Sequence, residues 1–186
     1  MLGNNTDLNM DENKKEKKKR DVIDAAVTYL SFSDRTIAEM KAYLKKKEYS
    51  SEDIAQAIEY LQDMNYVDDR DYAKRYIEQA VNRGKGSLKV KNELKKKGID
   101  SSIIDELQFE EEVFDKEEER QRAWEMAESF YEEVKDSFKL EPSDDFETKR
   151  EKYKEKQRAQ GKLGRRLVSK GYPQDVVYSI LRELFN

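Results

Sequence analysis

One short pattern occurs three times in this chain of 186 residues, and it limits the possible folds more than any other feature. Each copy begins with a leucine, contains at least one lysine and ends with a tyrosine or isoleucine. The copies are Leu44-Lys45-Lys46-Lys47-Glu48-Tyr49, Leu94-Lys95-Lys96-Lys97-Gly98-Ile99 and Leu167-Val168-Ser169-Lys170-Gly171-Tyr172. Five residues beyond each copy stands an aliphatic residue: Ile54, Ile104 or Val177. A unit this small cannot bury a hydrophobic face alone, so the copies must stack into a helical array.

The spacing of apolar residues predicts helices through most of the chain. Val22, Ala26 and Tyr29 begin a series at spacings of three and four, which is the period of one helix face. We therefore expect an all-α fold, an elongated array of three tandem three-helix repeats without strands. The expected divisions are a disordered basic and polar tail over 1–20, a first repeat over 21–65, a second over 66–108 and a third over 109–186. The third repeat is expected to have an acidic junction and a longer first helix.

Local signals predict several helix ends. Thr36-Ile37-Ala38-Glu39 has the form of a capping box, and Asp69 is expected to cap the first helix of the second repeat. Gly98 and Gly171 suit the left-handed residue that closes a helix. The stretch from Asp105 to Glu119 holds nine carboxylates and one lysine, which favours a solvated junction or a helix start over a core.

Composition narrows the class of protein. Charged residues make up 42% of the chain and hydrophobic residues 36%, whereas a compact globule has about a quarter charged residues, so thin helical layers are expected. The net charge of -4 excludes a uniformly basic protein that coats DNA, but it is compatible with local basic patches. Cysteine and histidine are absent, which excludes disulfides, thiol chemistry and the usual zinc sites.

Signals for membrane insertion and for catalysis are absent from the sequence. No apolar run approaches the length of a membrane span, and the N-terminus lacks the apolar core of a signal peptide. The usual acid–base residue at neutral pH, histidine, does not occur. Arg83-Gly84-Lys85-Gly86-Ser87 resembles part of a phosphate loop, but the spacing is wrong, so we interpret it as a helix–helix turn. We expect a cytoplasmic protein that is not an enzyme and has no metal, cofactor or membrane partner.

Basic clusters near the ends of equivalent helices are the remaining signal, and they have two interpretations. Cations there complement the negative end of a helix, and they would recur because the units repeat. Alternatively, the repeats present a periodic basic surface to a periodic anionic or acidic partner. The candidate partner-binding residues are Arg83, Lys85, Lys95, Lys96, Lys97, Lys162, Arg165, Arg166 and Lys170.

Three segments carry a resemblance to a known family. They are Tyr66-Val67-Asp68-Asp69-x-x-Tyr72-Ala73, then Lys85-Gly86 with Glu93-Leu94-Lys95-Lys96-Lys97-Gly98-Ile99, then Gln157 with Leu167-x-x-x-Gly171-Tyr172-x-x-Asp175-Val176. In this order they resemble the RecX family, bacterial regulators of the RecA recombinase. The resemblance covers the chain from about Asp21 to Leu184, nearly everything but the tail.

The resemblance implies a function that the residues alone do not. It implies three tandem three-helix repeats, binding to the RecA–DNA filament, and modulation, usually inhibition, of recombinase, ATPase and coprotease activity. We expect a monomer whose partner is the RecA filament. The alternative is a stand-alone helical module that binds single- or double-stranded DNA through phosphate contacts. The acidic net charge and the long acidic junction depart from the family pattern and weigh against tight, direct DNA binding.

Overall fold

The computed structural model describes residues 20–110 and 115–186, with the side chains of 108–110 left out. The expected tail, except for its last residue, and the centre of the expected acidic junction lie outside the described residues. Within the described ranges the chain is helical, with nine α-helices, one 3-10 helix and no strand. The expectation of an all-α fold is therefore confirmed.

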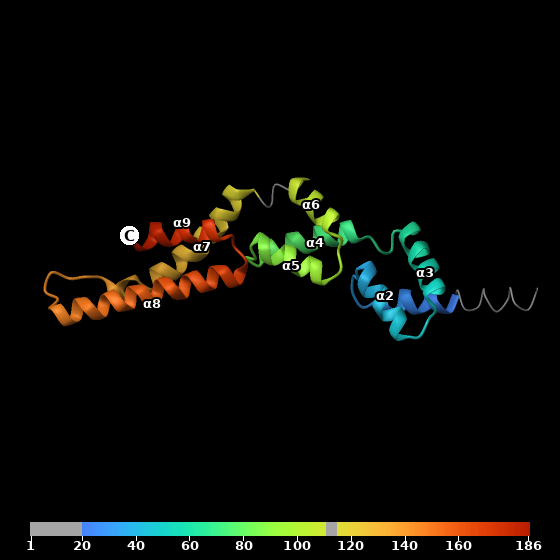
Figure 1. The fold of residues 1–186 in the computed structure, drawn as a ribbon, viewed down its shortest axis with the longest axis horizontal. Helices are drawn as coiled ribbons and strands as arrows, with labels where there is room; N and C mark the ends of the chain where they lie inside the picture. The colour runs from blue at the N-terminus through green and yellow to red at the C-terminus, as the bar shows by residue number, and fades with distance from the viewer. Residues whose placement is uncertain (1–19, 111–114) are drawn as a thin grey trace, which may run out of the picture. The chain divides into compact units, whose positions relative to one another are not determined.

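The helices follow one another through short connections (Figure 1). A first helix covers residues 20–30. The others are α2 Ile37–Lys46, α3 Ser51–Asp63, α4 Asp69–Asn82, α5 Ser87–Lys96, α6 Ser101–Glu110, α7 Lys116–Val134, η2 Lys135–Phe138, α8 Phe146–Lys170 and α9 Gln174–Phe185. None of these helices is long and apolar enough to cross a membrane.

Short-range hydrogen bonds fix the expected helix starts. The hydroxyl of Thr36 accepts from the Glu39 amide at 3.1 Å, and the Glu39 carboxylate accepts from the Thr36 amide at 3.2 Å. This reciprocal pair confirms the capping box at the start of α2. Asp145 caps α8 by accepting from the Thr148 amide at 2.7 Å.

The prediction that Asp69 caps α4 was wrong. Asp68 caps this helix, because its Oδ1 accepts from the amides of Arg70 and Asp71 at 2.7 and 3.0 Å. Asp69 bonds elsewhere: its Oδ1 accepts from the amide of Ile37, the first residue of α2, at 2.8 Å. The local sequence pattern correctly predicted that an aspartate caps α4. It could not predict that Asp69 bonds to the distant Ile37 amide and that Asp68 is therefore the cap.

The chain divides into two compact units. The N-terminal unit takes the residues up to Arg75 and the segment Leu94–Ile103, and the C-terminal unit takes Tyr76–Glu93 and Ile104–Asn186. The division falls inside α4, α5 and α6, so the middle helices contribute to both units. We describe each unit by itself.

The N-terminal unit buries a core from the first helix, α2 and α3. Leu44, the first residue of the first pattern copy, is fully buried in it, and Tyr29 stacks on Tyr43 with ring centroids 3.9 Å apart. The core residues are Val22, Ala26, Met40, Leu44, Ile54, Ala57, Ile58, Leu61 and Val67.

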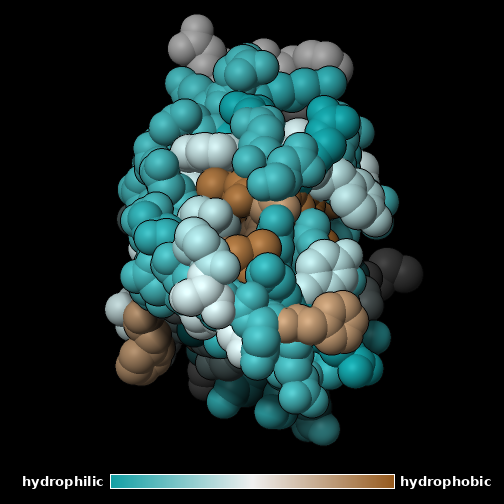
Figure 2. Space-filling model, turned by 90° about the vertical axis from the view of Figure 1, so that its left-hand side faces the viewer, coloured by the Kyte–Doolittle hydropathy of each residue, from teal (hydrophilic) through white to brown (hydrophobic). Residues whose placement is uncertain are grey.

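The C-terminal unit is built around α7, α8 and α9, which pack on one another (Figure 1). Leu167 of the third copy is fully buried there. The core residues are Ala123, Ala127, Phe130, Phe138, Ala159, Leu163, Leu167, Tyr172, Val177, Ile180 and Phe185. Around them the surface is mainly polar, and the face drawn in Figure 2 shows hydrophobic side chains in a hollow among hydrophilic ones.

Each unit contains one joint in which the start of a helix docks on the end of a later helix. In the N-terminal unit the start of α2 docks on the end of α5. There the Thr36 hydroxyl donates to the Lys97 carbonyl at 2.7 Å, beside the bond from the Ile37 amide to Asp69. We call this the α2–α5 joint.

In the C-terminal unit the start of α5 docks on the end of α8, and we call this the α5–α8 joint. The amide of Gly86 donates to the Lys170 carbonyl at 2.8 Å. The carboxylate of Glu119, from α7, accepts from the Ser87 amide at 2.6 Å and from the Ser87 hydroxyl at 3.0 Å. Glu119 is only 4% exposed and stands in the first turn of α7, so of the two expectations for the acidic stretch the helix start, and not the solvated junction, holds for this residue.

The two joints repeat the spacing of the sequence pattern. Ile37 and Ser87 are 50 residues apart, and so are their acceptors Asp69 and Glu119. The internal repeat therefore appears in long-range hydrogen bonds as well as in the helices.

Candidate interaction surface

Two of the predicted contact lysines are held within the protein. Lys97 lies 3.0 Å from the Glu39 carboxylate and 5.3 Å from the centroid of the Tyr72 ring. Burial lowers the pKa of Lys97, but hydrogen bonds to Tyr72 and Glu39 outweigh it and the net shift is upward. Lys97 thus remains a cation that ties the end of α5 to the start of α2.

Lys85 is held in a similar way in the C-terminal unit. Its Nζ lies 2.6 Å from the Glu93 carboxylate and 3.4 Å from the Tyr76 hydroxyl. The hydrogen bond to Glu93 raises the pKa of Lys85. Like Lys97, this half-buried lysine has a structural role that explains its presence without an external partner.

Other predicted residues are available to solvent. Lys95 and Lys96 are exposed at the end of α5, and Arg83 is exposed in the turn after α4. Lys170 is half-buried, and its Nζ donates to the Arg83 carbonyl at 3.2 Å. The sequence could not separate these residues, because the carboxylates and carbonyls that hold some of them lie in other helices.

The predicted residues of α8 lie on its solvent side. Lys162, Arg165 and Arg166 are exposed, while Leu163 and Leu167 point into the core. None of the three cations forms an ion pair with a carboxylate of the described residues. Lys162 lies 5.6 Å from the centroid of the Phe130 ring.

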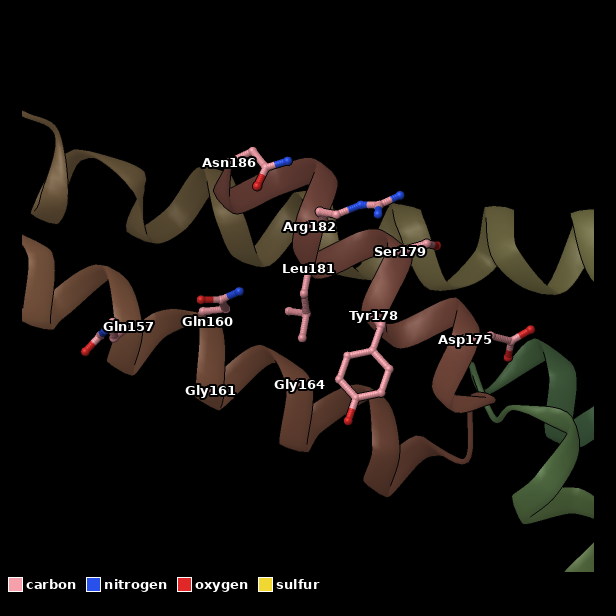
Figure 3. A pocket seen from close by; sticks show the side chains of 10 residues that line it. All are labelled: Gln157, Gln160, Gly161, Gly164, Asp175, Tyr178, Ser179, Leu181, Arg182 and Asn186. Carbon is pink, nitrogen blue, oxygen red and sulfur yellow. The ribbon is translucent and has the colours of Figure 1, made fainter.

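A groove runs between α8 and α9 beside these cations. It consists of two adjoining hollows of about 710 and 370 Å³. Figure 3 shows Tyr178 and Leu181 pointing from α9 towards Gly161 and Gly164 of α8. The lining residues are Gln157, Gln160, Gly161, Gly164, Arg165, Val168, Ser169, Gln174, Asp175, Val177, Tyr178, Ser179, Leu181, Arg182 and Asn186.

This groove was not predicted from the sequence. The packing of α9 on α8 leaves little room at Gly164, where a Cβ would meet the Leu181 side chain at 3.1 Å. The exposed Tyr178 was the available signal, since it lies off the buried stripe of α9.

The N-terminal unit has an equivalent groove between α2 and α3, of about 660 Å³. Counted from the leucine of each copy, its floor residues Ile54 and Ile58 occupy the positions of Val177 and Leu181. Its cations Lys41 and Lys45 come from α2. A groove between the second and third helices is therefore a recurrent feature of the pattern.

At the middle copy an ion pair joins the two helices that correspond to α8 and α9. Lys91 of α5 and Asp105 of α6 form an ion pair of 2.7 Å in the C-terminal unit. Counted from their leucines, these two residues occupy the positions of Gly164 and Tyr178. The middle copy thus provides an acid of its own where the third copy has an exposed tyrosine.

The surface is suited to binding. No cluster of three or more acids that could hold a metal ion is found in the described residues. Unpaired cations beside apolar grooves attract anionic or acidic partners and also offer apolar contact.

Two family models match the chain. The model of the first three-helix domain of RecX matches residues 23–61, and that of the second matches residues 68–107.

Curated relatives match over most of the chain. The regulatory protein RecX of Clostridium beijerinckii is 32% identical over 165 residues, which are 87% of this chain and 67% of the relative. RecX of Clostridium perfringens is 35% identical over 153 residues, 82% of this chain and 63% of the relative.

A solved structure has a similar fold. The crystal structure of RecX from Lactobacillus salivarius gives a TM-score of 0.71 at 24% identity, covering 91% of this chain and 97% of that one. At this identity the likeness shows the fold alone.

Proposed function

The chain belongs to the RecX family of regulatory proteins, and from this premise we propose that it binds the RecA–DNA filament and inhibits its recombinase, ATPase and coprotease activities. In this proposal the protein acts by binding, as a regulator rather than an enzyme. We further propose that its working units are the three-helix repeats over 21–65, 66–108 and 109–186, preceded by the tail over 1–20.

The recurrent groove is the observation that carries the proposal. Equivalent grooves flanked by cations follow the first and third copies, at Lys41 and Lys45 and at Arg165 and Arg182. A filament repeats the same surface from subunit to subunit, so a protein with repeated sites can contact several subunits at once. Linked weak contacts add through effective concentration, so no single contact has to be strong.

RecA-dependent ATP hydrolysis on single-stranded DNA tests the proposal. With increasing amounts of the protein we expect the hydrolysis rate to fall and to reach a plateau. A rate that stays constant, together with no co-sedimentation of the protein with the filament, would overturn the proposal.

Direct DNA binding is a second candidate function, favoured by Lys162, Arg165 and Arg166, which are exposed and without ion pairs in the described part of the chain. Binding to naked duplex through Z phosphates should weaken with salt at a log–log slope of about -0.9Z. No binding to naked duplex under conditions where filaments are bound would exclude this candidate.

A further inference from the structure

We propose that the groove between α8 and α9 docks an acidic peptide segment of a protein partner, with one apolar side chain of that segment seated beside Tyr178. This inference rests on the proposed function in one respect, namely that the segment belongs to a protein subunit of the filament. The groove itself is argued from its shape, its exposed apolar groups and its charge.

The groove leaves apolar surface uncovered. Tyr178 is 70% exposed and Val168 is 55% exposed, although both line the groove. Leu181 and Val177 continue this apolar lining. Contiguous apolar surface with a polar rim is typical of a protein interaction site, since covering it removes apolar area from water.

The fold does not explain Gly161. A Cβ there would meet only the Arg165 side chain of the same helix, at 3.4 Å, whereas the Cβ of an alanine at Gly164 would press on Leu181. Glycine in the interior of a helix is destabilising relative to alanine. Because nothing in the unit needs the space at Gly161, we assign that space to the bound segment.

Charge favours an acidic occupant. Arg165 of α8 and Arg182 of α9 lie along the groove, and neither is paired with a carboxylate of the described residues. Within the described lining of the groove, Asp175 has the one acidic side chain. At the middle copy an acid already stands at the position of Tyr178, where Asp105 pairs with Lys91 of α5. In the third copy Gly164 and Tyr178 replace this ion pair, so no bridge of this kind spans the groove between α8 and α9.

The lining favours a peptide over single-stranded nucleic acid. Bases of a single strand stack on successive aromatic side chains. Among the described residues that line the groove, Tyr178 is the one aromatic residue. One exposed ring in a groove that is also lined by two arginines suits one apolar anchor with neighbouring carboxylates.

The first test is Gly161→Ala, which fills the space and improves the helix. We expect a higher Tm together with filament binding weakened at least tenfold. The matched control is Asn92→Ala, an exposed helical position in α5 that also gains helix propensity and lies outside the groove. Gly161→Ala with unchanged filament binding would overturn the proposal.

The second test identifies the occupant. A photoreactive benzoyl-phenylalanine in place of Tyr178 should cross-link to an acidic segment of a RecA subunit, mapped by mass spectrometry. Cross-linking to DNA or to a non-acidic segment, or no cross-link while inhibition persists, would overturn the assignment.

A third measurement separates the groove from the proposed function. The probe is a short fluorescein-labelled peptide of glutamate and serine around one phenylalanine, with a lysine-for-glutamate peptide as control. We expect the acidic probe to bind the wild type and to lose binding with Arg165→Glu and Arg182→Glu. If this probe binds but filaments do not, the proposed function fails and the groove assignment stands. If neither binds, both fail.

Discussion

Asp68 and Asp69 are adjacent, yet they bond to different parts of the chain. Asp68 serves the free amides of its own helix, whereas Asp69 accepts from the first amide of α2. In the same way, Glu119 accepts from the amide of Ser87, the first residue of α5. Helix N-termini leave amides without intrahelical partners, and these acids satisfy one at each joint.

Replacing Glu119 by alanine should destabilise the protein. The Ser87 amide would lose its acceptor in a place where Glu119 is only 4% exposed, and an unsatisfied buried donor costs about 1–3 kcal/mol. Urea denaturation measures the loss. The control is Glu118→Ala, at an exposed position, which should cost about 0.5 kcal/mol or less. Equal effects of the two variants would show that Ser87 finds another partner.

Asp69→Asn should change how stability depends on pH. Burial raises the pKa of Asp69; the Ile37 amide opposes this and the Asp68 charge adds to it. With a raised pKa in the folded state, the contribution of Asp69 is full below its unfolded pKa and is lost as pH rises through the folded value. Asparagine does not titrate and can still accept from Ile37. The variant should therefore gain stability relative to wild type as the pH rises from the ordinary pKa of an aspartate, 3.8, through the raised pKa of Asp69 in the folded state.

Thermal unfolding of both proteins across this range measures the difference. If the variant instead becomes less stable than wild type as pH rises, the hydrogen bond from the Ile37 amide to the ionised Asp69 carboxylate outweighs the cost of burying that charge.

Reversing the exposed lysines should separate function from stability. Lys95→Glu with Lys96→Glu changes two exposed charges, and two contacts of about 0.5–1 kcal/mol each amount to about a tenfold loss of filament inhibition. Stability should stay near wild type. Lys97→Glu is the contrast, because it would place a carboxylate beside Glu39 and destabilise the α2–α5 joint. Full inhibition by the double variant would leave these lysines as helix-end residues only.

At the scale of elements, the two joints explain why the pattern copies are unequal. Gly98 and Gly171 have φ of 81° and 89°, and a Cβ on either would overlap the start of the docked helix, at Ala38 or Lys89. Glu48, at the same position of the first copy, has φ of 64° and is exposed. Glycine stands where another helix start approaches, and a larger residue stands where none does.

Gly171→Ala should therefore cost more than its backbone conformation alone. The left-handed conformation costs about 1–2 kcal/mol for a residue with a Cβ, and the overlap with Lys89 adds to it. We expect a loss of at least about 2 kcal/mol in urea denaturation. Glu48→Gly is the matched variant and should gain up to about 1 kcal/mol, since strain is relieved without any contact being lost. A loss in Gly171→Ala no larger than the gain in Glu48→Gly would contradict the role of the joint, because the backbone conformation alone would then account for both changes.

The sequence predicted the helices better than the joints. Period and capping signals are local, so α2, α5 and α8 could be expected from residues near their ends. The hydrogen bond that Asp69 accepts from the Ile37 amide joins residues 32 apart, and no local rule selects Asp69 over Asp68 for it. The same limit applies to the candidate surface, because Lys97 differs from Lys95 only through Glu39 and Tyr72, which belong to other helices.

At the scale of the whole molecule, the rules of the joint bear on self-association. A joint needs two parts. One is a helix whose first amide has no partner within the helix, as at Ile37 and Ser87, and the other is a later helix that ends in a glycine, as at Gly98 and Gly171. Counted from the leucines, the third-copy residue equivalent to Ile37 and Ser87 is Gln160, which lies inside α8 because this helix begins at Phe146. The amide at Gln160 is already used within the helix, so a further joint cannot form there.

At the end of α2, Glu48 prevents this kind of joint. A docked helix start would meet its side chain where Gly98 and Gly171 leave space, so a second copy of the chain cannot add there by the same joint. We therefore predict a monomer at concentrations up to about 100 μM, measured by sedimentation equilibrium, because head-to-tail contacts that do not close would otherwise give open polymers. The Glu48→Gly variant should remain monomeric, since Gln160 still lies inside α8 and provides no free helix N-terminal amide for a joint. Concentration-dependent association of the wild type, abolished by charge reversal at Lys46 and Lys47, would show that the end of α2 is an interface and would contradict this account.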